Sequence, residues 1–132
     1  MPGTLRTIET KLATMSLVAP GYIEQRFRVG VAMDREGFEE NRQVRHMLGG
    51  AAPYVMLSVI PEGVDFQLDV VTIDHFGMEP EGSGLSALAV VAGDNLLTSI
   101  THLFFKYFPP SFPARVFNNE AGAQAWLATL RT

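Results

Sequence analysis

Histidine and carboxylate side chains are the groups in this sequence that could bind a metal or transfer a proton. His46, His75 and His102 are too far apart for the i, i+4 pair of a helical metal site, and Glu-x-x-Glu-x-x-His patterns are absent. Asp74 and His75, with Asp69 nearby, could form a proton-transfer cluster, although the polar end of a helix explains the same residues. The spacing therefore predicts no metal site.

Motifs of the common catalytic centres are also missing. The chain has no cysteine, no Gly-x-Ser-x-Gly elbow, no Walker loop and no Gly-x-Gly-x-x-Gly after a strand. We therefore expect no catalytic residue and no cofactor, and the chain is predicted not to be an enzyme.

Length and composition predict one globular domain over residues 1–132, since 47% of the residues are hydrophobic and 18% are charged. The net charge is −4 and the ten basic residues are scattered, which argues against nucleic acid as a partner. The N-terminus lacks the pattern of a secretory signal, and the apolar runs are too short to span a bilayer. We expect a cytoplasmic protein without stable membrane insertion.

The first half of the chain predicts an antiparallel hairpin, a helix and a buried strand. The stretches "TKLATMSLV" and "YIEQRFRV" have strand character, and Pro20-Gly21 between them fits a tight turn. Asp34 can cap a helix over "REGFEENRQVRHML", which Gly49-Gly50 ends. The continuous apolar run "YVMLSVI" is typical of a strand buried on both faces.

The second half predicts further alternation of strands and helices. Residues 62–77 are ambiguous, with an acidic start that favours a helix, and "LSALAVVA" is a second buried strand. Asp94 can cap a helix that Pro109-Pro110 stops, "ARVF" is a short strand near a sheet edge, and Asn118 or Asn119 caps a last helix. The core-facing stripe of the Asp94-capped helix is predicted to consist of Leu96, Leu97, Ile100, Leu103, Phe104, Tyr107 and Phe108. The predicted fold is α/β with a mixed sheet.

Three stretches carry a family resemblance: "YVMLSVIPEGVDF", "AVVAGDNLLTSITHLFFKYF" and "PPSFPARVFNNEAGAQAWL". In this order they resemble the SpoIIAA-like proteins of the STAS/SEC14 type, small bacterial domains related in fold to anti-sigma-factor antagonists. The resemblance covers nearly the whole chain, and none of the stretches is a catalytic signature. It implies a mixed sheet, opened by the N-terminal hairpin, with helices mainly on one face.

The serine switch of phosphorylatable STAS domains does not carry over. That switch lies in a turn after a central strand, and here the turn after "VMLSVI" reads "PEGVDFQLD", without serine or threonine. "GSGLSAL" resembles a displaced copy, but it precedes a strand, so Ser83 is interpreted as an ordinary loop residue.

Two groups of residues are candidate sites. Asn41, with Arg45 one turn on, interrupts the apolar stripe of the first helix, so Asn41 either ties down a neighbouring loop or lines a polar pocket together with Arg45, Asp74 and His75. Phe105 projects off the stripe predicted for its helix, and it is a candidate partner contact on the face shared with Thr98, Thr101 and His102.

Three functions remain open. The first hypothesis is a non-enzymatic interaction module that binds a second copy of itself or a protein partner through a helical face. The second, suggested by the SEC14 side of the resemblance, is a carrier of a small apolar ligand or lipid, with the Phe-rich helix and "DVVTIDHF" as pocket walls. The third is an acid–base enzyme that uses Asp74 and His75.

Overall fold

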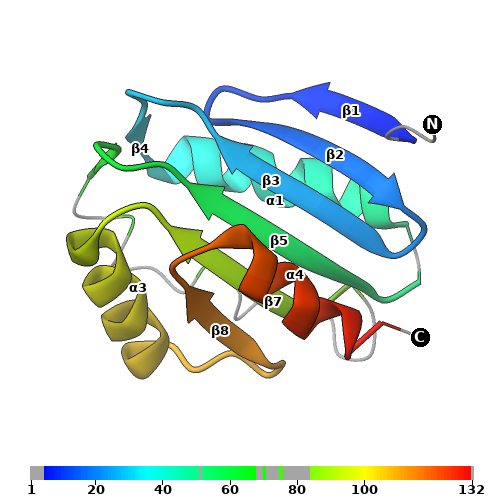
Figure 1. Ribbon diagram of the computed structural model, residues 1–132. Helices are drawn as coiled ribbons and strands as arrows, with labels where there is room; N and C mark the ends of the chain where they lie inside the picture. Colours follow the sequence, from blue (N-terminus) through cyan, green and yellow to red (C-terminus); the bar gives the residue numbers. More distant parts are fainter. Residues whose placement is uncertain (1–4, 51, 68–69, 71–74, 76–83, 132) are drawn as a thin grey trace.

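The computed structural model describes residues 5–50, 52–67, 70, 75 and 84–131. Among them, a six-stranded sheet with the strand order β1-β2-β3-β5-β7-β8 forms the centre of the molecule (Figure 1). A separate two-stranded sheet pairs β4 with β6. The elements are β1 (Arg6–Glu9), β2 (Ala13–Ala19), β3 (Tyr22–Phe27), β4 (Ala32–Met33), α1 (Arg35–Gly49), β5 (Tyr54–Ile60), β6 (Asp65–Phe66), β7 (Leu85–Ala92), α3 (Asn95–Tyr107), β8 (Ala114–Phe117) and α4 (Glu120–Ala128).

The large sheet is mixed, as the sequence predicts. The strands β1, β2 and β3 pair antiparallel, while β3, β5, β7 and β8 pair parallel. Gly21 has a φ of 75° in the turn between β2 and β3, which glycine adopts without the steric penalty of a side chain. The predicted opening hairpin and the edge position of β8 are therefore confirmed.

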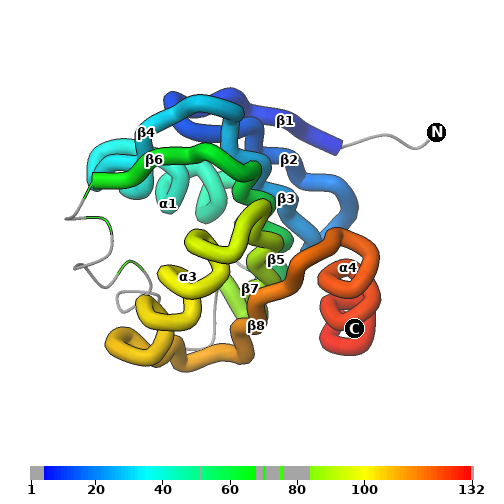
Figure 2. Tube along the Cα trace, turned by 60° about the vertical axis from the view of Figure 1, so that its left-hand side comes forward, coloured from blue at the N-terminus to red at the C-terminus, as the bar shows by residue number. Residues whose placement is uncertain are grey.

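Helices cover both faces of the sheet. The tube in Figure 2 shows α1 and α3 on one side of the strands and α4 on the other. Alternation along the buried strands produces this arrangement: Leu88 and Val90 of β7 belong to the core under α1 and α3, whereas Ala87 and Ala89 belong to the core under α4. Two helices on one face and one on the other fit the expectation of helices mainly on one face.

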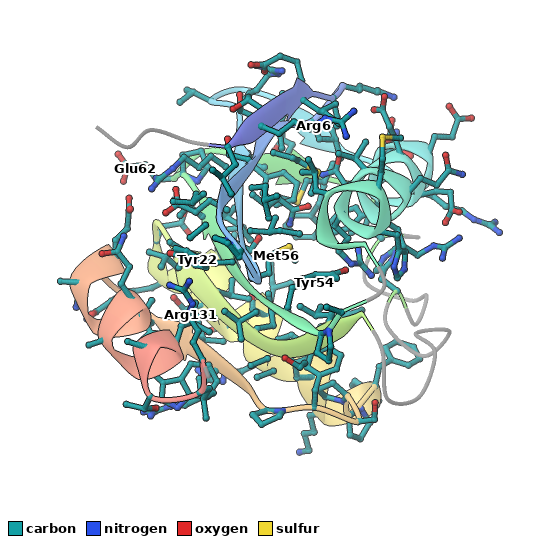
Figure 3. All side chains as sticks on the ribbon, turned by 90° about the vertical axis from the view of Figure 1, so that its right-hand side faces the viewer. Arg6, Tyr22, Tyr54, Met56, Glu62 and Arg131 are labelled. Atoms are coloured by element: carbon teal, nitrogen blue, oxygen red, sulfur yellow. The ribbon has the colours of Figure 1, made fainter. Side chains whose placement is uncertain are left out.

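Side-chain direction on the central strands follows the same rule. In Figure 3, Tyr54 and Met56 of β5 lie on the α1 side of the sheet, and Tyr22 of β3 lies on the α4 side. Arg131, just after α4, places its guanidinium 4.8 Å from the Tyr22 ring centroid. Because Tyr22 is buried between the sheet and α4, the pKa of its hydroxyl is raised. The two cores are thus separated by the sheet itself.

The predicted caps begin all three described helices. Asp34 accepts a hydrogen bond from the amide of Gly37, Asp94 from that of Leu97, and Asn119 from that of Gly122. Gly50 ends α1 with a φ of 68°. Within the described ranges, no helix combines the length and the apolarity that a bilayer crossing requires.

Two local predictions need correction. The lean towards a helix over 62–77 is wrong at Asp65–Phe66, which form β6 by pairing with β4; most of the segment that follows lies outside the described residues. The predicted core stripe of α3 is wrong in its orientation, because Leu96, Leu103 and Tyr107 are exposed. The helix presents Leu97, Ile100, Thr101, Phe104 and Phe105 to the sheet instead.

Candidate functional site

The predicted polar pocket comes together only in part. Asn41 and Arg45 are both buried on α1, facing the sheet. His75 lies near α3, in contact with Phe104. Asp74 lies outside the described residues, as does Ser83 of the displaced serine motif.

Asn41 belongs to a chain of hydrogen bonds that runs across the buried face of the sheet. Its Oδ1 accepts a 2.6 Å bond from the hydroxyl of Thr10, and its Nδ2 donates a 3.1 Å bond to Oε1 of Gln25. Gln25 in turn donates through Nε2 to the hydroxyl oxygen of Ser58, at 2.9 Å. Asn41 therefore ties the loop before β2 to β3, which agrees with the structural alternative for this residue.

An apolar pocket lies at the other end of this chain, between the sheet and the inner face of α3. Its volume is about 100 Å³, and β3, β5 and β7 form its floor. Gln25 and Ser58 are the polar residues of that floor, with 6% and 4% of their surface exposed. Among the described lining residues there is no lysine, arginine, aspartate or glutamate, so the pocket suits an uncharged occupant.

Aromatic rings form one wall of the pocket. The His75 ring stacks on Phe38 of α1, with ring centroids 4.5 Å apart, and on Phe104 of α3, at 5.7 Å. Phe104 also meets Phe105 edge to face at 5.5 Å. His75 Nε2 lies 2.5 Å from the carbonyl oxygen of Val70, which fixes the ring in place. His75 thus joins α1 to α3 rather than facing an acid in the described part of the chain.

The predicted contact face of α3 is divided between the inside and the outside of the molecule. Phe105 and Thr101 line the pocket, and Thr98 is half-buried with its hydroxyl bonded to the carbonyl oxygen of Asp94. His102 is exposed. The expectation that Phe105 points away from the core is therefore wrong, since Phe105 packs against the core cluster.

The apolar surface of α3 that reaches solvent is a different one. Leu96, Leu103 and Tyr107 are 66%, 52% and 72% exposed. Their spacing, i, i+7 and i+11, places them on one side of the helix, and we call this set the outer face of α3. It is formed by residues that the sequence pattern assigned to the core.

Gln25 and Ser58 were not singled out from the sequence, although a signal for them is present. Gln25 alternates with Ile23 and Phe27 on the inward side of its strand, and Ser58 interrupts the apolar run "YVMLSVI". Each is a polar residue at a position that the pattern predicts to be buried. Buried polar groups have partners in folded proteins, so such positions indicate a hydrogen-bond network even before its members are known.

Apart from the buried Arg45 of α1, two charged pairs lie away from the pocket. Arg26 of β3 makes two hydrogen bonds, of 2.8 and 3.0 Å, to the carboxylate of Glu120 at the start of α4. These bonds lower the pKa of Glu120 against the opposing effect of partial burial. Lys11 pairs with Asp34, and that bond lowers the pKa of the Asp34 carboxyl. Within the described residues, no three histidine or acidic side chains gather as a metal site would require.

A mixed sheet that begins with an antiparallel hairpin and continues with parallel β-α-β units defines the class of this domain. A family model described as SpoIIAA-like matches residues 26–128. The chain therefore belongs to the SpoIIAA-like family.

A solved structure supports the same fold. The chain is similar to an uncharacterized protein of the DUF3478 family, with a SpoIIAA-like fold, from Shewanella loihica PV-4. The sequence identity is 18% and the TM-score 0.55, and the match covers 96% of this chain and 95% of the other. At this identity the likeness shows the fold alone. No curated protein matches the sequence.

Proposed function

We propose that this SpoIIAA-like domain is a non-enzymatic protein-interaction module and that the outer face of α3 is its contact surface. The observation that carries the proposal is the exposure of Leu96, Leu103 and Tyr107 on one side of a single helix. Scattered apolar residues are ordinary on protein surfaces, but three large ones in a row on one helix are typical of a contact.

The absence of a recognisable catalytic centre among the described residues supports a non-enzymatic role. His46 and His102 lie on different helices and His75 is stacked between two phenylalanines. The chain has no cysteine for nucleophilic chemistry. A binding role needs only a surface, and the outer face of α3 supplies one.

A second copy of the chain is the partner that we propose. A helix with an apolar strip along one side can pack against the same strip of a twofold-related copy, so one surface completes the interface. His102 and Lys106 are exposed beside the strip and would remain at the rim, where solvent screens the charge of Lys106.

The test compares Leu103→Glu with Leu130→Glu by native mass spectrometry and sedimentation equilibrium. We expect the wild type to dimerise and Leu103→Glu to weaken the dimer at least about tenfold, because the interface would then hold a desolvated carboxylate. Leu130 is 38% exposed and lies after α4, on the other side of the sheet, so its variant should dimerise normally. Circular dichroism must show both variants folded.

The remaining outcomes decide between partners. A wild-type monomer that captures a protein from host lysate, with capture lost in Leu103→Glu and kept in Leu130→Glu, would retain the interaction module but overturn the second copy as the partner. Equal behaviour of the wild type and Leu103→Glu in both assays would overturn the outer face of α3 as a contact surface.

A further inference from the structure

The pocket beneath α3 has a polar end and an apolar body. The body is formed by side chains such as Met56, Leu88, Val90 and Ile100, with Phe104 and Phe105 as its aromatic wall. An apolar cavity of roughly 150 Å³ is large enough to hold a benzene-sized molecule and stays free of water. At about 100 Å³, this pocket is smaller than that cavity, so it takes a single ring only if its side-chain walls move slightly outward, and it is too small for a lipid chain.

The hydrogen bonds that lead to the polar end of the pocket are all donated in the same sense along the chain, towards Ser58. The Thr10 hydroxyl donates to Asn41, the Asn41 amide to Gln25, and the Gln25 amide to Ser58. Each group in this chain accepts from the previous one and donates to the next. The chain therefore ends at the hydrogen of the Ser58 hydroxyl, on the floor of the pocket.

That hydroxyl hydrogen lacks an acceptor in the described part of the chain. Ser58 is buried, and the bond that its side chain makes there is the one it accepts from Gln25. The other polar side chains of the lining already contact backbone carbonyls: Thr101 donates to that of Leu97, and His75 Nε2 lies beside that of Val70. A buried donor without an acceptor is unfavourable, so an oxygen of a ligand in the pocket would complete the chain.

We propose that this pocket binds a compact, uncharged aromatic molecule that carries one carbonyl oxygen. The ring lies against Phe104 and Phe105, and the carbonyl oxygen accepts a hydrogen bond from Ser58. This inference is independent of the proposed interaction module, because the pocket lies under the inner face of α3 and the contact surface lies on its outer face.

Acetophenone and ethylbenzene are suitable probes, since they share a ring and a similar shape while ethylbenzene lacks the acceptor. Each is titrated into the full chain, and binding is followed by two-dimensional ¹H–¹⁵N and methyl NMR spectra. We expect both probes to shift the signals of Leu88, Ile100 and Phe105. Ser58→Ala should weaken acetophenone about fivefold to tenfold and leave ethylbenzene unchanged or slightly tighter.

Ser86→Ala is the matched control. Ser86 lies on the neighbouring strand β7 and donates to the carbonyl oxygen of Tyr54, away from the pocket. This variant should bind both probes like the wild type. Should Ser58→Ala fail to fold, the comparison moves to the wild type alone, where phenol serves as a third probe whose hydroxyl can also donate a hydrogen bond.

Three results would overturn the proposal. Absence of shifts at the pocket signals up to the solubility limit of both probes would show that the pocket takes no such ligand. Equal weakening or no weakening of both probes in Ser58→Ala would show that the hydroxyl does not select a carbonyl. In the wild type, phenol binding at least tenfold more tightly than acetophenone would show that the pocket requires a donor. None of these results affects the oligomer test on the outer face of α3.

Discussion

Asn41 illustrates how a buried polar residue fixes one element on another. The side chain is almost fully buried, and it is hydrogen-bonded on one side to Thr10 and on the other to Gln25. These two bonds set the position of α1 along the sheet more narrowly than apolar contacts do, because a hydrogen bond is directional and a buried one is unfavourable to leave unmade.

We predict that Asn41→Ala destabilises the domain by about 2–3 kcal/mol, because it leaves the buried Oε1 of Gln25 without a hydrogen-bond donor and opens a small void. Urea unfolding followed by circular dichroism measures this. Gln43→Ala, at an exposed position of the same helix, should change the stability by no more than about 0.5 kcal/mol. Similar values for the two variants would show that the Asn41 hydrogen bonds contribute little.

At the scale of elements, the contact between the ends of β5 and β7 depends on a close approach of two backbones. The amide of Gly93, just after β7, donates a 2.8 Å bond to the carbonyl oxygen of Ile60 at the end of β5. A Cβ at Gly93 would lie 2.3 Å from the amide nitrogen of Glu62 and 2.8 Å from the carbonyl carbon of Pro61. These are backbone atoms, so they cannot turn aside as a flexible side chain can.

Gly93→Ala should therefore destabilise the domain by about 3 kcal/mol or more, through forced separation of the two strand ends. Gly63→Ala is the comparison, because Gly63 has a φ of 80° and a Cβ there would meet nothing within 4 Å. Its expected loss of unfolding free energy is about 1–2 kcal/mol, from backbone strain alone. Thermal unfolding of the two variants tests whether Gly93→Ala destabilises the domain more than Gly63→Ala. A smaller loss at Gly93 than at Gly63 would contradict the steric argument.

The orientation of α3 is also decided at this scale. The helix carries apolar side chains over slightly more than half of its circumference, so stripes that differ by a small rotation have similar hydrophobicity. The observed helix is rotated by roughly 60° from the predicted stripe, at 100° per residue. That rotation places Phe105 and Thr101 inside and Leu103 and Tyr107 outside, which changes the candidate contact surface.

For the molecule as a whole, α4 closes the second face of the sheet and a charged pair fixes its first turn. Ala123 and Leu127 of α4 pack on that face, and the Arg26 bonds to Glu120 join the helix to β3. About two fifths of each charged side chain is exposed, at 42% for Arg26 and 40% for Glu120, so solvent screening keeps the contribution of the pair below about 1 kcal/mol.

This pair predicts a change in pH dependence. The folded pKa of Glu120 is lowered, mainly by the Arg26 hydrogen bonds, so its contribution is present above the unfolded value of 4.5 and is lost as the pH falls through the folded pKa. Arg26→Met should reduce the loss of unfolding free energy between about pH 5 and pH 3, as measured by urea unfolding.

Two further variants isolate the Glu120 carboxyl. Glu120→Gln should reduce the pH dependence of the unfolding free energy over the same range to a similar degree. The double variant with Arg26→Met should show little further reduction, because the two residues act as one pair. Full additivity of the two substitutions would contradict this assignment.

The sequence alone predicted the opening hairpin, the three capped helices and the burial of the central strands, but not the small sheet of β4 and β6. Turn residues such as Pro20-Gly21 and capping residues such as Asp34 and Asp94 act through contacts within a few residues, so their outcome can be derived locally. An apolar run such as "LSALAVVA" predicts a buried strand because its composition favours no exposed face. The structure confirms the hairpin, the three capped helices and the mixed sheet.

Only the tertiary structure decided which side of α3 faces the sheet and which polar residues meet. Gln25, Asn41 and Ser58 come from three different elements, and the packing of α1 on β3 together with the pairing of β3 with β5 places them in one chain. The pocket likewise forms only because side chains of α3, such as Ile100 and Phe104, lie opposite Gln25 and Ser58 of the sheet. Contacts between residues so distant in sequence depend on the relative positions of whole elements, which no local pattern specifies.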